Sequence, residues 1–73
     1  MHTSNADITV VICTRNRVDS LRATLSALAR ADRAGLQCEI VVVDNGGTDS
    51  TPQLVGEPIP GLPVHYFREE RPG

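Results

Sequence analysis

Two short runs of mostly β-branched residues, at residues 8–13 and 39–44, constrain the fold of this 73-residue chain more than any other feature. Both runs have the length of a strand and almost no polar interruption, as expected for strands covered on both faces. Between them, residues 18–34 repeat apolar side chains at three- and four-residue steps, at Val18, Leu21, Leu25 and Leu28. The pattern predicts a strand, an amphipathic helix and a second strand parallel to the first.

Both ends of the expected helix carry recognisable signals. Asp19 or Ser20 can cap its start, and Gly35 follows at a position suited to a left-handed C-terminal cap.

The remaining residues predict a loop, a short helix and a third strand. Residues 45–49 form a glycine-containing loop, and Pro52 suits the first turn of a short helix that runs to Val55. After a proline-rich connection, residues 63–67 have the pattern of a strand. We therefore expect residues 1–73 to form a single partial α/β domain. It would be a truncated Rossmann-like half with three mostly parallel strands, one long helix and one short helix, in the order β-α-β-α-β. Its open sheet edges favour association with another chain.

The charge composition excludes several classes of protein. All seven cations are arginines, so no lysine is present for a Schiff base or a phosphate-binding loop. The net charge of −2, without a basic run, gives no surface for nucleic acid or anionic lipid. The first residues do not resemble a signal peptide, and no apolar stretch is long enough to span a membrane, so we expect a cytoplasmic chain.

The two cysteines, Cys13 and Cys38, have neither the spacing of a CxxC pair nor a histidine placed to complete a zinc site. The sequence favours buried, reduced thiols at both positions.

Ligands of open α/β sheets bind beyond the carboxyl ends of the strands. Two segments fall there, and we take eight of their residues as candidates for binding a nucleotide: Cys13, Thr14, Arg15, Asn16, Arg17, Asp44, Asn45 and Gly46. In this interpretation Asp44 accepts a hydrogen bond from a base ring or a ribose hydroxyl, and Arg15 or Arg17 meets a diphosphate.

A purely structural interpretation of the same residues is open as well. Arg15 and Arg17 can be solvated loop residues, and Asp44 and Asp49 can cap the helix after the second strand. Neither GxGxxG nor GxxxxGK[ST] occurs, so a dinucleotide fold and a phosphate-loop NTPase are not supported.

Taken together, ITVVICTRNRVDSLRATLSAL and EIVVVDNGGTDST resemble the opening of the family 2 glycosyltransferases. The family pattern has a strand ending in Thr-x-Asn-Arg, a leucine-striped helix, and a strand ending in Asp-[Asp/Asn]-Gly-Ser-Thr-Asp. The resemblance implies the fold called GT-A and transfer of a sugar from a nucleotide-diphospho-sugar. It also implies that Cys13, Thr14 and Arg15 lie against the base and that Asp44 hydrogen-bonds the base ring.

The sequence departs from the family pattern in three respects. Arg15 stands where many members have an aromatic residue, and Gly47 stands where serine is usual. The Asp-x-Asp triplet, which the resemblance associates with Mn²⁺ or Mg²⁺ in a full-length parent, does not occur. We assign no catalytic or metal-binding residue, since Glu69 and Glu70 suit a solvated surface and His65 a strand. The chain is thus expected to hold the donor nucleotide without catalysing transfer alone.

Two other functions remain open. A flavodoxin-like or receiver-like regulatory module would also begin with parallel strands, although receivers need clustered acids and a lysine. A non-functional remnant would have the same residues as the donor-binding fragment.

Overall fold

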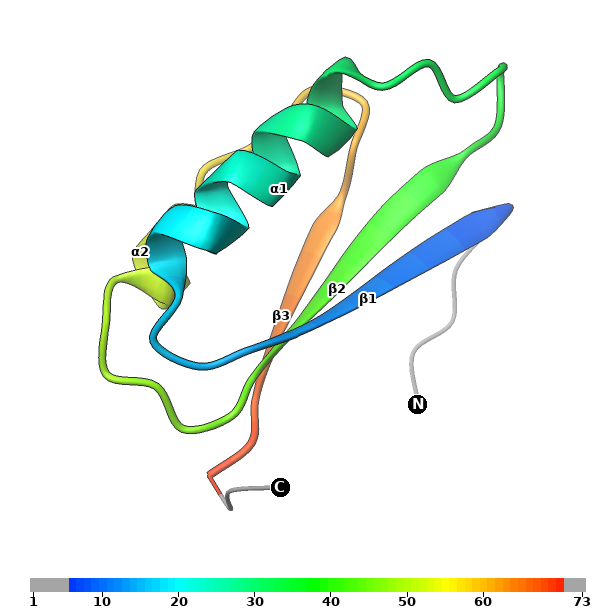
Figure 1. Ribbon diagram of the computed structural model, residues 1–73. Coiled ribbons are helices and arrows are strands. Elements are labelled where there is room, and N and C mark those ends of the chain that lie inside the picture. The colour runs from blue at the N-terminus through cyan, green and yellow to red at the C-terminus, as the bar shows by residue number, and fades with distance from the viewer. Residues whose placement is uncertain (1–5, 71–73) are drawn as a thin grey trace.

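The computed structural model describes residues 6–70 of the chain. The described part contains β1 (Ile8–Thr14), α1 (Val18–Arg30), β2 (Cys38–Asp44), α2 (Thr51–Val55) and β3 (Val64–Arg68). The strands form one parallel sheet in the order β1-β2-β3, and both helices lie on the same side of it (Figure 1). The predicted β-α-β-α-β order is confirmed.

The register aligns the carboxyl ends of the three strands. Thr14 of β1 pairs with Asp44 of β2, and Asp44 pairs with Arg68 of β3. Paired residues in a sheet point to the same face, so these three side chains lie in one row on the helix side. The end of β3 therefore contributes to the same edge of the sheet as the two predicted loops.

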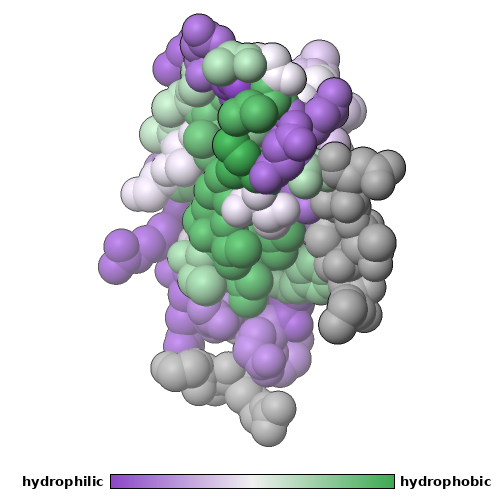
Figure 2. All heavy atoms as spheres, turned by 90° about the vertical axis from the view of Figure 1, so that its right-hand side faces the viewer, coloured by the Kyte–Doolittle hydropathy of each residue, from purple (hydrophilic) through white to green (hydrophobic). Residues whose placement is uncertain are grey.

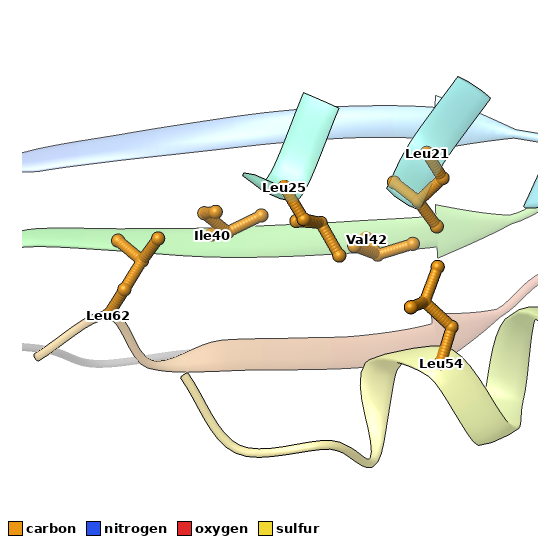
Figure 3. Close-up of a cluster of buried hydrophobic side chains, with 6 residues drawn as sticks. All are labelled: Leu21, Leu25, Ile40, Val42, Leu54 and Leu62. Carbon is orange, nitrogen blue, oxygen red and sulfur yellow. The ribbon is translucent and has the colours of Figure 1, made fainter. Parts of the chain in front are cut away.

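A small aliphatic core joins the helices to the sheet. Ile40 and Val42 of the central strand have no exposed surface. The buried leucines around them come from both helices and the connection before β3 (Figure 3): Leu21, Leu25, Leu54 and Leu62. Full burial of such a side chain contributes about 1.5–3 kcal/mol, so the core depends mainly on these six residues.

α1 follows the predicted leucine stripe but ends earlier than the sequence suggests. Leu21 and Leu25 are buried, whereas the helix stops at Arg30 because Ala31 adopts an extended conformation with φ −69° and ψ 144°. Gly35, expected to cap the helix, instead has φ +77° in the turn that leads to β2. The left-handed glycine was identified correctly, but it serves the connection rather than the helix end.

The sheet face away from the helices is largely uncovered. The prediction that the first strand is covered on both faces is wrong for β1, in which Val11 is 62% exposed. Phe67 of β3 is 49% exposed on the same face. We call this surface the open face; by strand alternation its apolar residues are Val11, Cys13, Val41, Val43 and Phe67. Figure 2 shows a band of hydrophobic residues on the side of the molecule away from α1.

Both cysteines are free thiols, but Cys13 is exposed on the open face and Cys38 is only half-buried. The prediction of two buried thiols is therefore wrong. Cys13 is exposed because no layer covers the open face in the described residues, whereas Cys38 lies on the helix side at the start of β2, where it is only partly covered.

The other end of the open face is polar. Glu39 of β2 is 3% exposed; it accepts a hydrogen bond from the Thr9 hydroxyl at 2.6 Å, and its other oxygen lies 3.2 Å from His65 Nε2. His65 is thus a strand residue, as predicted, and its imidazole contacts a carboxylate at the opposite end of the strands from the candidate loops.

A cleft of about 310 Å³ also lies at that opposite end, between the last turn of α1 and the starts of β1 and β2. Its lining is mainly aliphatic and includes Ile8, Leu28 and Leu36. It lacks the converging polar groups that orient a nucleotide, so we do not take it as the candidate site. Neither described helix is both long and apolar enough to cross a membrane.

Candidate functional site at the carboxyl ends of the strands

The two predicted loops lie side by side. We call residues 15–17 the first loop and residues 45–50 the second loop; they follow β1 and β2 at the lower left of Figure 1. The Asn45 N–H donates to the Thr14 carbonyl at 2.8 Å, which extends the β1–β2 pairing into the loops. The prediction that residues from both segments meet at one edge is confirmed.

Asp44 is the buried centre of this edge. Its carboxylate is 1% exposed; Oδ1 accepts a hydrogen bond from the Gly47 N–H at 2.9 Å and Oδ2 accepts one from the Tyr66 hydroxyl at 2.7 Å. Arg68 Nη1 lies 3.6 Å from the same Oδ2. Both oxygens therefore accept hydrogen bonds from the protein itself, and Asp44 holds the second loop in shape through the Gly47 N–H.

Arg68 connects the end of β3 to this centre, a contribution that the sequence interpretation missed. Its Nη1 donates to the Gly47 carbonyl at 2.8 Å, and its Nε donates to Glu70 at 2.6 Å. The hydrogen bond to Glu70, with a further one to Tyr66, raises the pKa of Arg68. The guanidinium thus stays charged beside the second loop.

Tyr66 was also missed as a site residue. Burial, and then its hydrogen bond to Asp44, raises the pKa of the phenol. It therefore remains protonated and acts as the donor to Asp44. The signal that could have found both residues is the strand register, because β3 ends beside β2 and places Tyr66 and Arg68 on the face that Asp44 occupies.

Asn16 joins the first loop to the second. It adopts a left-handed conformation with φ +52°, which asparagine tolerates better than most residues. Its Oδ1 accepts a hydrogen bond from the Thr48 N–H at 2.7 Å. This side chain, predicted to contact a ligand, is used within the protein.

Gly47 lies where the two loops are closest. A Cβ atom there would lie 2.9 Å from Asp44 Oδ1 and 3.1 Å from both the backbone nitrogen and Oδ1 of Asn16. The 2.9 Å contact is shorter than real Cβ atoms show, so a larger residue at position 47 would require Asp44 or Asn16 to shift. The departure from the family's serine thus has a local structural reason.

Asp49 caps both helices, whereas Asp19 or Ser20 had been expected to cap α1. One oxygen, Oδ2, accepts the Val18 N–H at the start of α1 at 3.0 Å, and Oδ1 accepts the Thr51 N–H at the start of α2 at 3.1 Å. The hydrogen bonds to Thr51 are the main cause that lowers the pKa of Asp49. The structural interpretation of Asp49 as a cap for the helix after β2 is confirmed, and Asp49 also caps the start of α1.

The remaining candidates differ in how accessible they are. Arg15 and Arg17 are exposed, and Asn45 and Gly46 are half-buried at the rim of the second loop. Thr14 is 6% exposed, and its hydroxyl is buried without a hydrogen-bond partner. Strand alternation places Cys13 on the open face, away from the row formed by Thr14 and Asp44.

A metal site is not formed by the described residues: no group of three or more His, Cys, Asp or Glu side chains is placed to hold an ion within residues 6–70. Glu70 is paired with Arg68, and the Glu69 N–H donates to the Asp44 carbonyl at 2.8 Å. The described residues do not fit a divalent cation.

Comparison with known proteins identifies the chain's relatives at the level of a family. Residues 9–73 match the family model described as Glycosyl transferase family 2. No curated protein and no solved structure matches the chain. The match covers nearly the whole sequence, including both loops and β3. The chain therefore belongs to glycosyl transferase family 2, as the N-terminal part of its GT-A fold.

Proposed function

We propose that this chain binds the nucleotide of a nucleotide-diphospho-sugar donor at the two loops and does not transfer the sugar by itself. The observation that carries the proposal is the pair of exposed arginines beside a second loop that is held in shape by Asp44. Family membership supports a sugar-donor substrate. Members of the family often use a divalent cation, for which residues 6–70 supply no site.

Arg15 and Arg17 are the groups best suited to the diphosphate. Within residues 6–70 neither guanidinium takes part in a hydrogen bond or ion pair, so both are available to a ligand. Guanidinium groups bind phosphate oxygens through paired hydrogen bonds. The first loop also leads into the N-terminus of α1, whose dipole favours an anion.

Asn45 and Gly46 are the groups best suited to the base or the ribose. The Asn45 amide offers both a donor and an acceptor at the rim, and Gly46, which has φ +77°, carries no side chain that would keep a ligand away from the backbone. We assign Asp44 a supporting role, since Gly47, Tyr66 and Arg68 already surround its carboxylate.

Calorimetric titration with UDP and, separately, GDP tests the proposal, with and without manganese. Two charge-assisted contacts and one base contact correspond to a Kd of about 0.1–1 mM. Arg15→Gln and Arg17→Gln should each weaken binding about tenfold. Arg22→Gln is the matched control, because it removes the same charge from the exposed side of α1. There Arg22 makes one long ion pair, with its Nη1 3.9 Å from Glu57 Oε1.

Three results would count against the proposal. A folded chain that binds neither nucleotide favours the non-functional remnant. An equal loss of binding in Arg22→Gln indicates a non-specific charge effect. Release of UDP from a UDP-sugar above the rate in buffer contradicts the statement that the chain is inactive alone. No observation favours the regulatory module over the donor-binding fragment or the non-functional remnant.

A further inference from the structure

Asp49 makes contacts that a simple helix cap does not. Its local contact, to the Thr51 N–H, spans two residues and is the ordinary way in which aspartate begins a helix. Its second contact, to the Val18 N–H, spans 31 residues and links the second loop to the start of α1. One carboxylate thereby fixes the position of two helices relative to each other.

Two further hydrogen bonds act across the same pair of loops. The Thr48 N–H donates to Asn16 Oδ1, and the Asn45 N–H donates to the Thr14 carbonyl. Together the three bonds hold the first loop at its beginning, middle and end. Both candidate arginines lie between these attachment points: Arg15 lies between Thr14 and Asn16, and Arg17 lies between Asn16 and Val18.

We propose that Asp49 is a positioning residue for the donor site. By accepting hydrogen bonds from both helices it holds the first loop against the second, so that Arg15 and Arg17 are in place before a nucleotide arrives. A flexible loop would have to become ordered on binding, which reduces affinity. The inference rests on the proposed function, because it assigns Asp49 a role in that same site without contact to the ligand.

Asp49→Ser separates the cross-loop contact from the local cap. Serine at this position can still accept the Thr51 N–H, because Ser caps helices well. Its hydroxyl lies one bond closer to the backbone than a carboxylate oxygen, so it does not reach the Val18 N–H. Asp49→Ala removes both contacts. Ser50→Ala is the matched control, since Ser50 is the neighbouring loop residue and its side chain makes no capping hydrogen bond.

The experiment measures nucleotide affinity by calorimetry and the hydrogen exchange of individual amides by NMR, on each full-length variant. We expect Asp49→Ser to bind UDP or GDP at least about tenfold more weakly than the wild type. The amides of Val18 and Thr48 should exchange faster, whereas those of α2 should remain protected. Ser50→Ala should match the wild type in both measurements.

The outcomes separate this inference from the proposed function. Wild-type affinity in a folded Asp49→Ser chain would overturn the positioning role and leave a cap that serves stability alone. Unchanged exchange at Val18 and Thr48 would do the same. If the wild type binds no nucleotide at all, the proposed function fails, while the exchange data still report whether Asp49 joins the two loops.

Discussion

At the scale of single residues, the candidate site depends on tight packing around Gly47. Asp44 and Asn16 both lie within 3.1 Å of the place that a Cβ atom at position 47 would occupy, and the Asp44 carboxylate is held by Gly47, Tyr66 and Arg68. A site organised in this way tolerates changes at its exposed rim better than changes beneath it.

Gly47→Ala tests this packing. The added methyl group would meet Asp44 Oδ1 at 2.9 Å, and overpacking of this kind costs about 1–3 kcal/mol of unfolding free energy. Gly56→Ala is the control, because a Cβ atom there has ordinary contacts of 3.5 Å and the backbone is already helical. It should be neutral or stabilise by about 0.4–1 kcal/mol. Urea unfolding of both variants and the wild type measures the difference in unfolding free energy. If Gly47→Ala is as stable as the wild type, the loops can relax around the added methyl group.

At the scale of helices and strands, every element was predicted from the sequence but not every boundary, and α2 was predicted from Pro52 rather than from a pattern of apolar residues. The leucine stripe identified α1, and the β-branched runs identified β1 and β2, because burial imposes a period that can be read along the chain. The early end of α1 could not be predicted: Ala31 leaves the helix in an extended conformation although Gly35 is the stronger local signal.

The site was predicted in its location and only partly in its members. The rule that ligands bind at the carboxyl ends of parallel strands found both loops. Tyr66, Arg68 and the second contact of Asp49 were missed because they depend on strand register and on contacts between distant segments, which one sequence does not contain. The register of β3 with β2 is the specific information that was lacking.

The capping of both helices by Asp49 predicts a dependence on acid. The folded state lowers the pKa of this carboxyl below its usual value of 3.8. A group whose pKa is lowered by folding stabilises the protein above its unfolded pKa, and this stabilisation is lost as the pH falls through the folded value. The difference in unfolding free energy between wild type and Asp49→Asn should therefore be constant above about pH 5 and shrink below pH 4.

Denaturant titrations between pH 3 and pH 7 measure this difference. Asp19→Asn provides the comparison, because it removes the same charge from an exposed residue in the first turn of α1. An Asp49→Asn difference that persists unchanged to pH 3 would contradict a role for the charged carboxylate in capping.

At the scale of the whole molecule, the described chain has one covered and one open sheet face. Val11 and Phe67 expose large apolar surfaces on the open face, and both β1 and β3 are edge strands of the described sheet. Exposed apolar surface next to unpaired edges favours self-association.

The double variant Val11→Thr, Phe67→Thr should therefore remain monomeric to higher concentration than the wild type, as measured by light scattering. Threonine preserves the strand preference of both positions. Because Val11 is 62% and Phe67 49% exposed, we expect a change in unfolding free energy within about 1 kcal/mol. Equal self-association of the two proteins would mean that the open face is not where chains meet.

The open face also determines how the chain responds to oxidation. Cys13 points to the open face, whereas Cys38 is on the helix side at the other end of the neighbouring strand, where it pairs with Ile8. Val43, the partner of Cys13, lies five positions further along β2 than Cys38, which corresponds to roughly 16 Å, far beyond the span of a disulfide. No bridge can therefore form within the folded chain. An oxidant would link Cys13 to a thiol on another molecule, and the bond would join the two at the uncovered side of their sheets.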